Sequence, residues 1–414
     1  SVTGNQTVAN LAATWIDSQQ KDTELVKSWE EEAASNAWLY TQALALIVFS
    51  KTNMARADKL VKILANLQNP DGSWYDGYDT NGNAITSNKW VGSISWTIYA
   101  LIYYLNEKGI LYEAKDAAIK GADWLKSQQT AEGKIHNVTE GNIDAWWAFK
   151  KVGYEAEANA LKDYLLKDYL SGGVWDSSQK RWIAGTNDNG IALDVQTWGA
   201  SFAKEIGETQ RGLEALSFAK LTLATTDFNQ NIQGFDGFGP FSVWNEGTLQ
   251  YVVSGGENAQ FYLDEMIKQQ RTDGALPGSP NNFTGDSVWL STWHGIAPTA
   301  WLYFANTGGP FKHILPPPLC PVIVYPNPYK PNSGCGHNFG IRFGKLTAEA
   351  TIKIYNVVGE LIRTIKEPDD GLIDGVATWD AKNEHGEKVA SGIYIYVITN
   401  SAGEKCTGKI GIVK

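Results

Sequence analysis

The sequence predicts an all-α (α/α)6 toroid, made of twelve helices in six hairpins, followed by a small all-β immunoglobulin-like sandwich. A two-part helical unit recurs six times before residue 310, and a Pro-rich segment follows it. The remaining residues alternate between apolar and polar types, with Gly, Asn and Asp at the turns. We therefore place the toroid at residues 1–310, a linker at residues 311–321 and the sandwich at residues 322–414.

The two parts of each helical unit differ in where they carry apolar residues. The first part is amphipathic, with apolar residues at i, i+3 and i+4, and is predicted to form the outer layer. These segments are residues 9–20, 57–74, 118–133, 157–173, 211–228 and 258–277. The second part is apolar on nearly all sides, which indicates a buried inner helix. These segments are residues 36–49, 90–105, 142–153, 192–207, 246–256 and 294–305. The inner helices of such a ring are parallel, so their N-terminal ends and the long loops entering them are expected to line one mouth.

The C-terminal part has the pattern of a small β domain. Pro316 to Pro318 cannot continue a helix and indicate a semi-rigid linker. Residues 322–414 then predict about seven short strands separated by turn residues. Cys335 and Cys406 are candidates for a disulfide bond, although small buried thiols fit the sequence equally well.

The composition restricts the partners of the protein. Asp and Glu number 45 against 35 Lys and Arg, which gives a net charge of −10, so nucleic acid is not an expected partner. No apolar run approaches the roughly 18 residues of a membrane span. All three Cys lie in or beside the small domain, which excludes a Cys-ligated zinc ion in the toroid. We expect neither a metal ion nor a cofactor. The 17 Trp residues suit flat sugar faces as well as a core.

Residues 5–305, with their helical hairpins and Trp-rich loops, resemble the six-hairpin glycosidase superfamily in architecture and residue choice. This resemblance implies a carbohydrate substrate and cleavage of a glycosidic bond. The stretch from Gln68 to Trp74 also resembles the QxxxGxW repeat of terpene cyclases, and Gln129 to Gly133 is a partial copy. The acid cluster with which those enzymes protonate an alkene is missing, so we interpret these units as structural turn anchors.

Glycoside hydrolysis needs a protonated carboxylic acid and an ionised carboxylate, and four acids at the predicted mouth are candidates. Glu246 follows Trp244 and heads an apolar segment, where burial would raise its pKa, so it is our first candidate for the acid. Glu140 and Asp144 have i, i+4 spacing, which suits a base and its orienting partner. Asp194 repeats this position one hairpin later. Each of the four also fits a structural role, as a first-turn acid or a helix cap.

Aromatic side chains in the mouth loops are candidates for stacking on sugar rings. The predicted substrate-binding residues are Trp74, Trp90, Trp182, Trp198, Trp244, Trp293 and His294. A lone His at a mouth also fits a structural, hydrogen-bonded role. By contrast, Trp residues inside helices are expected in the core, namely Trp38, Trp96, Trp124, Trp147 and Trp301.

Four short motifs stand in the small domain: Tyr325-Pro-Asn-Pro328, Ile354-Tyr-Asn-Val-Val-Gly-Glu360, Trp379-Asp-Ala-Lys-Asn383 and Ser391-Gly-Ile-Tyr394. On these motifs, about 90 residues resemble the FlgD-type immunoglobulin-like module and the related C-terminal sorting domains of type IX secretion. The resemblance implies an extracellular or cell-surface protein that contacts secretion machinery. The chain opens at Ser1 without a signal-like stretch, which fits a processed mature form.

Together these features predict a secreted glycoside hydrolase whose substrate is a polysaccharide or oligosaccharide. We expect a neutral, β-linked glucan, cleaved in an endo-acting, inverting manner by acid and base carboxylates at the toroid mouth. Two alternatives stay open. A polysaccharide lyase would need a cation for a uronate, and Arg181 is the obvious mouth candidate. A non-catalytic glycan-binding toroid would need no carboxyl pair at all.

Overall fold

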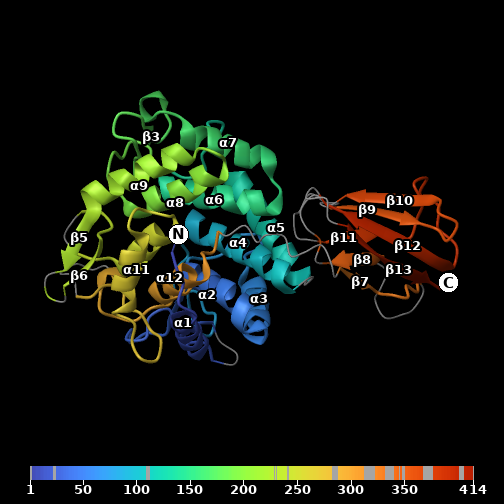
Figure 1. The fold of residues 1–414 in the computed structure, drawn as a ribbon, viewed down its shortest axis with the longest axis horizontal. Helices are drawn as coiled ribbons and strands as arrows, with labels where there is room; N and C mark the ends of the chain where they lie inside the picture. Colours follow the sequence, from blue (N-terminus) through green and yellow to red (C-terminus); the bar gives the residue numbers. More distant parts are fainter. Residues whose placement is uncertain are drawn as a thin grey trace.

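The computed structural model shows a ring of helices and a separate β domain (Figure 1). It describes the chain except for residues 1, 22–24, 109–111, 228, 230, 240–241, 282–287, 312–321, 332–339, 345, 347–349, 367–375, 401–404 and 414. Twelve α-helices fall within the described residues before 310, and seven strands fall within those after 322. Both units predicted from the sequence, the (α/α)6 toroid and the small β domain, are confirmed. No helix among the described residues is long and apolar enough to cross a membrane.

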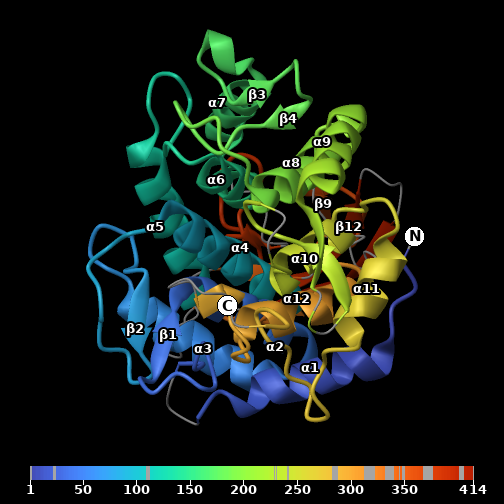
Figure 2. The same cartoon turned by 90° about the vertical axis from the view of Figure 1, so that its left-hand side faces the viewer.

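Six helices form the inner ring, and each contacts the next around the circle and back to the first (Figure 2). They are α2 (Leu39–Thr52), α4 (Val91–Lys108), α6 (Thr139–Val152), α8 (Leu193–Glu205), α10 (Asn245–Val253) and α12 (Ile296–Thr307). The predicted inner segments are all confirmed. Every residue from Val91 to Ile102 is buried, since α4 packs against α2, α6 and an outer helix at once.

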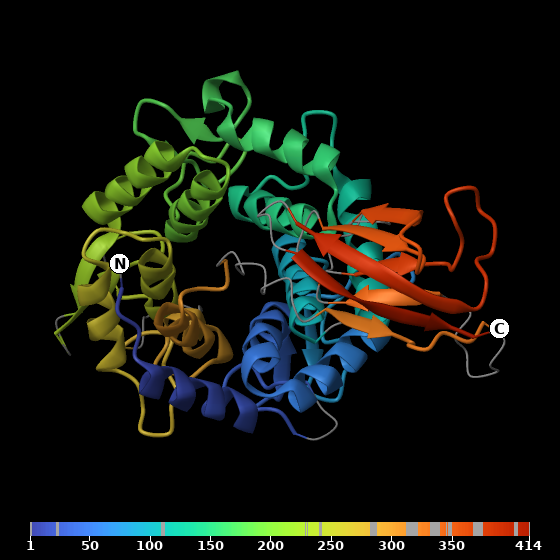
Figure 3. The ribbon, with the colours of Figure 1, turned by 45° about the vertical axis from the view of Figure 1, so that its right-hand side comes forward.

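The outer helices surround this ring (Figure 3). They are α1 (Gln6–Ser18), α3 (Met54–Leu67), α5 (Tyr112–Gln128), α7 (Glu155–Leu166), α9 (Thr209–Leu223) and α11 (Ala259–Ile267). The six predicted outer segments are confirmed as helices, although each extended into the turn that follows. The first helix, α1, packs against the last, α12, and this contact closes the toroid.

The loops that enter the inner helices carry short strand pairs that the sequence did not predict. The pairs are β1 (Asn36–Trp38) with β2 (Gly77–Asp79), β3 (Trp175–Asp176) with β4 (Arg181–Trp182), and β5 (Ala224–Asp227) with β6 (Ile232–Phe235). Two 3-10 turns, η1 (Tyr169–Ser171) and η2 (Val288–Leu290), complete these loops. Strands of two to four residues are too short to show a period of two, which is why the sequence pattern missed them.

The β domain consists of two antiparallel sheets with a shared core. The strands are β7 (Ile323–Tyr325), β8 (Ile341–Gly344), β9 (Thr351–Tyr355), β10 (Leu361–Lys366), β11 (Ala377–Trp379), β12 (Gly392–Thr399) and β13 (Lys405–Ile412). One sheet has the order β10-β9-β12-β13 and the other β11-β8-β7. Phe343 and Trp379 are fully buried between them. Cys406 is disulfide-bonded, and Cys335, the partner suggested by the sequence, lies outside the described residues.

Glutamine side chains join neighbouring outer helices at the ends of their turns. Gln68 Nε2 donates to the carbonyl oxygens of Gly72 at 2.9 Å and Ala117 at 2.8 Å, and Trp74 Nε1 donates to Leu64 O at 2.7 Å. The Gln68 side chain therefore ties the turn after α3 to the neighbouring outer helix α5, which confirms the turn-anchor interpretation. The same arrangement joins Gln129 to Gly133 and Glu157, and Gln270 to Gly274 and Val8. The third copy, at Gln270, was missed although it has the same spacing from Gln to Gly as the unit at Gln129.

Glycine is required in these anchors for two reasons. Gly72 has a φ of +89°, which L-residues with a side chain rarely adopt. A Cβ atom there would also lie 2.2 Å from Lys120 O on the next outer helix, far inside contact distance. The anchor thus depends on close backbone approach as well as on conformation.

We expect Gly72→Ala to lower the free energy of unfolding by at least about 2 kcal/mol, because backbone strain and the clash with Lys120 add. Gly207→Ala is the matched control. Gly207 has a φ of +84° with nothing within 4 Å of its Cβ position, so only the strain of roughly 1–2 kcal/mol applies. Urea unfolding followed by Trp fluorescence measures both. Equal losses in the two variants would contradict the role of close packing.

Candidate active site

A cavity of about 360 Å³ opens among the N-terminal ends of the inner helices. It is lined by Trp29, Trp38, Tyr40, Thr41, Glu140, Asp194, Trp198, Phe238, Trp244, Glu246, Gln250, Trp289 and Ala297. Three of the four predicted catalytic acids, Glu140, Asp194 and Glu246, meet in this cavity. The set contains no Lys or Arg among the described residues. Carboxyl groups and aromatic rings therefore dominate this mouth of the ring.

Glu246, the second residue of α10, is 6% exposed and is held by two donors. Its Oε1 accepts hydrogen bonds from the Tyr40 hydroxyl at 2.8 Å and from Gln250 Nε2 at 3.2 Å. Tyr40 itself accepts a hydrogen bond from Trp301 Nε1 at 2.9 Å. Burial raises the pKa of Glu246 to about 7, although the Tyr40 hydrogen bond acts in the opposite direction. Glu246 can therefore hold or release a proton near neutral pH.

Glu140 and Asp194, in the first turns of α6 and α8, form a hydrogen-bonded carboxyl pair. Burial, and then the charge of Asp194, raise the pKa of Glu140 well above its ordinary value, so Glu140 holds the proton. Burial raises the pKa of Asp194 to about 6, opposed by the Val195 N–H, which donates to Asp194 Oδ1 at 2.7 Å. The pair thus carries one proton and one negative charge near neutral pH.

Asp144, predicted as the orienting partner of Glu140, lies one turn further along α6 and does not line the cavity. It is 4% exposed and borders a much smaller void below, together with Trp96 and Trp147. Burial raises its pKa well above its ordinary value. Trp96 lies near enough to favour the ionised form, yet Asp144 Oδ2 has no hydrogen-bond partner of good geometry among the described residues. The hydrogen-bonded partner of Glu140 is therefore Asp194 rather than Asp144.

Two of the predicted sugar-stacking residues, Trp198 and Trp244, line the cavity. Trp74 and Trp182 do not, because both are fully buried. Their indole N–H groups donate to carbonyl oxygens of the outer helices α3 and α7. Their assignment to substrate binding is wrong, since a position in a mouth loop does not show which way the ring points. Trp182 instead packs against Gly199 of α8, where a Cβ would lie 2.5 Å from its ring.

Trp90 and Trp293 are half-buried and are not among the residues that line the cavity. Trp90 packs edge-on against His136, with ring centroids 4.8 Å apart. The sequence predicted that both rings would bind substrate, but neither contributes to the cavity wall.

Several cavity residues were missed from the sequence. Trp38 was expected in the core, but α2 begins only at Leu39, so Trp38 stays in strand β1 at the mouth. Trp29 and Trp289 lie in the loops that enter α2 and α12, and the loop rule that selected other Trp residues would also have selected them. The remaining helical Trp residues belong to the core as predicted: Trp96, Trp147 and Trp301 are buried, and Trp124 is partly buried against it.

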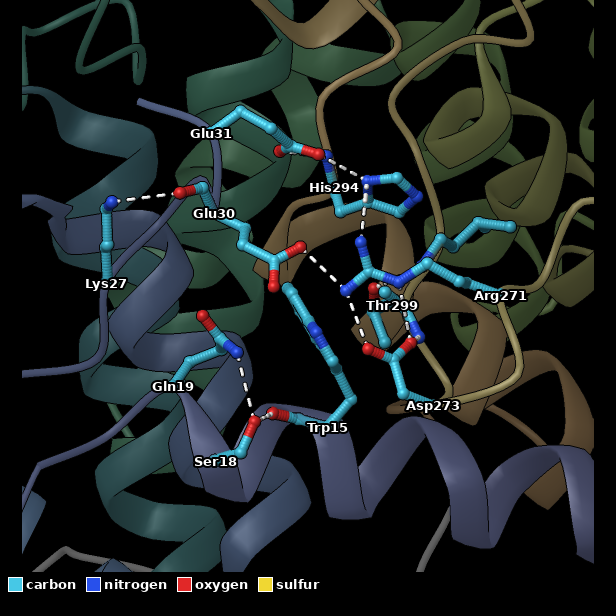
Figure 4. A network of polar contacts seen from close by, with 12 residues as sticks. Trp15, Ser18, Gln19, Lys27, Glu30, Glu31, Arg271, Asp273, His294 and Thr299 are labelled. Carbon is cyan, nitrogen blue, oxygen red and sulfur yellow. Dashed lines mark hydrogen bonds and ion pairs between the residues drawn. The ribbon is translucent and has the colours of Figure 1, made fainter. Parts of the chain in front are cut away.

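His294 belongs to a polar network beside the cavity rather than to its lining (Figure 4). Its Nδ1 pairs with Glu31 Oε1 at 2.6 Å, and its backbone N–H donates to Glu31 Oε2 at 2.7 Å. Arg271 pairs with Glu30 and with Asp273, both at 2.7 Å. Ligand atoms of Glu30, Glu31 and His294 come within 4.8 Å of one another, but Glu30 is paired with Arg271 and Glu31 is bonded to His294. The network joins the loop before α2 to the loop before α12.

Arg181, the cation that a lyase would need at the mouth, is also structural. It is 4% exposed and donates to the carbonyl oxygens of Gly190 and Asn189, each at 2.9 Å. Its guanidinium group lies over the ring of Phe218, outside the cavity. It is therefore already engaged by the protein.

Comparison with known proteins agrees with both units. Residues 323–413 match the CHU_C type IX secretion signal domain. The ring is similar to a glycosidase variant in complex with glucose, with a TM-score of 0.57 at 11% identity over 73% of this chain and 96% of that chain. It is also similar to cellobiose 2-epimerase from Bacillus thermoamylovorans, with a TM-score of 0.54 at 12% identity over 73% and 100% of the two chains. A sugar epimerase from a ruminal bacterium gives 0.53 at 11% identity, over 73% and 99%.

At these identities the similarity shows the fold alone. No curated protein matches the sequence. The protein thus combines an α/α toroid of the kind found in glycosidases and sugar epimerases with a C-terminal type IX secretion signal domain. That domain indicates export to the cell surface or the extracellular space.

Because its pKa is raised in the folded protein, Glu246 lowers the free energy of unfolding at high pH. The carboxyl group ionises near pH 4.5 in the unfolded chain but only near 7 in the folded protein, so stability falls as pH rises between these values. We expect Glu246→Gln to stabilise the protein by about 3 kcal/mol more at pH 8 than at pH 4, at about 1.4 kcal/mol per pKa unit. The control is Glu113→Gln on the exposed start of α5. Urea unfolding at pH 4 and pH 8 measures the free energy of unfolding of both variants. An effect of Glu246→Gln that does not depend on pH would contradict the burial of an ionisable group.

Proposed function

We propose that the ring is a glycoside hydrolase that cleaves a neutral, β-linked, glucose-based glycan in the mouth cavity. One observation carries the proposal: a carboxyl group with a pKa near 7 and a carboxyl pair that shares one proton line the same aromatic cavity. Glycoside hydrolysis needs this combination, because one carboxyl group must protonate the leaving oxygen while another acts as a base.

The contacts support a role for each acid. Glu246 is the general acid, because its pKa lies near the pH at which it would work. Asp194 is the general base that activates water, since its backbone contact with Val195 keeps it the more acidic member of its pair. Glu140 keeps its proton, donates a hydrogen bond to Asp194 and so orients it. Direct attack by water gives inversion at the anomeric carbon, which the anomer first released would reveal.

The cavity lining supports a neutral substrate. A uronate or phosphorylated sugar would need a cation, and the described lining residues include no Lys or Arg. Flat aromatic rings from Trp38, Trp198 and Trp244 suit the apolar faces of pyranoses. The similar structures name glucose and cellobiose, which favours a glucose-based, β-linked glycan. At about 360 Å³ the cavity is near the lower end of small-molecule sites, about 300–1,000 Å³, so we propose a short oligosaccharide or a chain end as the ligand.

Sugar epimerisation is the second candidate, because two of the similar toroids are epimerases. That reaction moves a proton between the two faces of a carbon atom next to a carbonyl group and needs an open-chain sugar. It changes the configuration of the sugar without creating a new reducing end. The two candidates are therefore separated by product analysis alone.

We expect cello-oligosaccharides and other neutral gluco-oligosaccharides to yield new reducing ends. Glu246→Gln and Asp194→Asn should each lower kcat by about 10³-fold or more, because proton transfer by a positioned side chain contributes about 10²–10⁴-fold. Asp76→Asn is the matched control, since Asp76 is a mouth carboxyl group that accepts from Ser93 outside the cavity lining. Products separated by chromatography decide the outcome. Isomers without new reducing ends would establish the epimerase, and no product from any glycan would remove both enzymes.

The rate should depend on pH in a bell shape, rising as Asp194 ionises near 6 and falling as Glu246 ionises near 7. Tyr40→Phe removes a hydrogen bond that favours ionised Glu246, so the pKa of Glu246 rises and the falling limb moves to higher pH. Tyr78→Phe, which removes a hydroxyl group outside the cavity lining, should leave both limbs in place. A falling limb unmoved by Tyr40→Phe would assign it to another group.

A further inference from the structure

The segment that follows α12 turns back into the ring instead of leaving it. Gly308 and Gly309 have φ values of +97° and +89°, which allow the reversal. The Tyr99 hydroxyl donates to Pro310 O at 2.8 Å and fixes the segment within the ring. Phe311 was predicted as the first residue of the linker, yet its side chain packs against the toroid core.

Phe311 contacts aromatic residues of three inner helices. Its ring stacks on Trp147 of α6, with centroids 4.8 Å apart and planes at 24°. It lies 5.5 Å from the ring of Trp96 on α4 and 6.3 Å from that of Trp301 on α12. Trp301 donates to Tyr40, and Trp96 packs edge-on against Tyr40 at 5.8 Å. A single intermediate layer thus connects Phe311 to the tyrosine that binds Glu246.

Phe311 also separates two spaces along the ring axis. On the active-site side is the small void bordered by Asp144, Trp96 and Trp147, with about 10 Å³ of room, which is space for about one water molecule. Asp144 Oδ2 and both indole nitrogens are buried there without a hydrogen-bond partner among the described residues. On the other side is a cavity of about 750 Å³ at the C-terminal ends of the inner helices. Phe311 and Trp147 line both spaces.

We propose that Phe311 is a positioning residue that closes the floor of the active site, keeping water of the far cavity away from Asp144 and supporting the aromatic layer beneath Tyr40. It acts through other residues and does not touch the mouth cavity. Its effect on turnover rests on the proposed hydrolase function, but its effect on the carboxyl groups does not. Residues 308–311, which directly follow α12, then support the site.

The electrostatic consequence follows from the groups around Asp144. Titratable groups that face it are Glu140 on its own helix, Asp194 on α8, Tyr40 on α2 and Tyr99 on α4. Burial is the largest cause of the raised pKa of Asp144, Glu140 and Asp194. Opening the floor admits water to these three carboxyl groups and lowers their pKa values toward the ordinary range.

The test is a graded series in the full chain, Phe311→Leu, Phe311→Val and Phe311→Ala, which opens the floor step by step. We expect Phe311→Leu to keep the seal and a near-normal pH profile. Phe311→Ala should shift the rising limb to lower pH by at least about half a unit and lower kcat at least about tenfold, with less than about a twofold change in KM. Phe218→Ala, a partly buried Phe on outer helix α9, is the matched control and should change neither.

A second measurement keeps the outcome independent of catalysis. Titration of carboxyl groups by ¹³C NMR should show the buried carboxyl signals of Phe311→Val and Phe311→Ala titrating at lower pH than in the parent protein, even if no glycan is cleaved. If Phe311→Ala does not fold, the Leu and Val variants still give the gradient. Carboxyl titrations unchanged across the series, and equal to those of Phe218→Ala, would overturn the proposal.

Discussion

The rest of this protein depends on one constraint, which is that four carboxyl groups lie close together at the centre of the ring, away from bulk water. Asp144 and Glu246 are 4% and 6% exposed, Glu140 and Asp194 are partly buried, and burial is the largest cause of the raised pKa of all four. Burying such groups is unfavourable unless they are protonated or hydrogen-bonded. In the ring, the buried carboxyl groups are stabilised by shared protons and by hydrogen-bond donors such as Tyr40 and Gln250. Burial also raises the pKa of Asp194 to about 6 and that of Glu246 to about 7, so both groups can exchange protons near neutral pH. Acid and base catalysis would require this property.

A site of this kind needs a scaffold that does not relax around it. The inner helices are buried on nearly all sides, so their N-terminal turns have little freedom to move apart. The outer helices are joined by Gln side chains that bridge two carbonyl groups, at Gln68, Gln129 and Gln270. These anchors lie in the outer layer, whereas the carboxyl groups lie on the inner helices. They stabilise the ring as a whole, and the ring holds the acids together despite their repulsion.

The sequence predicted the ring well because helical periodicity extends over more than ten residues in most of its segments. It also placed Glu246, Glu140 and Asp194 at one mouth, since parallel inner helices bring their first turns together. It could not give the direction of a side chain in a loop, which is why Trp74 and Trp182 were assigned to the cavity although they are buried. Trp38 was missed because its position depends on where α2 begins, to within one residue.

Phe311 shows a different limit of sequence patterns. Gly and Pro residues around it are typical of a linker, and they do end α12, but the same residues allow the chain to reverse into the ring. Local composition identifies where a helix stops, whereas the destination of the next residues depends on a cavity assembled from α4, α6 and α12. This ring has a cavity at each end, and Phe311, Trp96 and Trp147 border the small void that lies between the two. Phe311 thus packs as part of the ring, although it stands just before the chain that continues into the secretion signal domain.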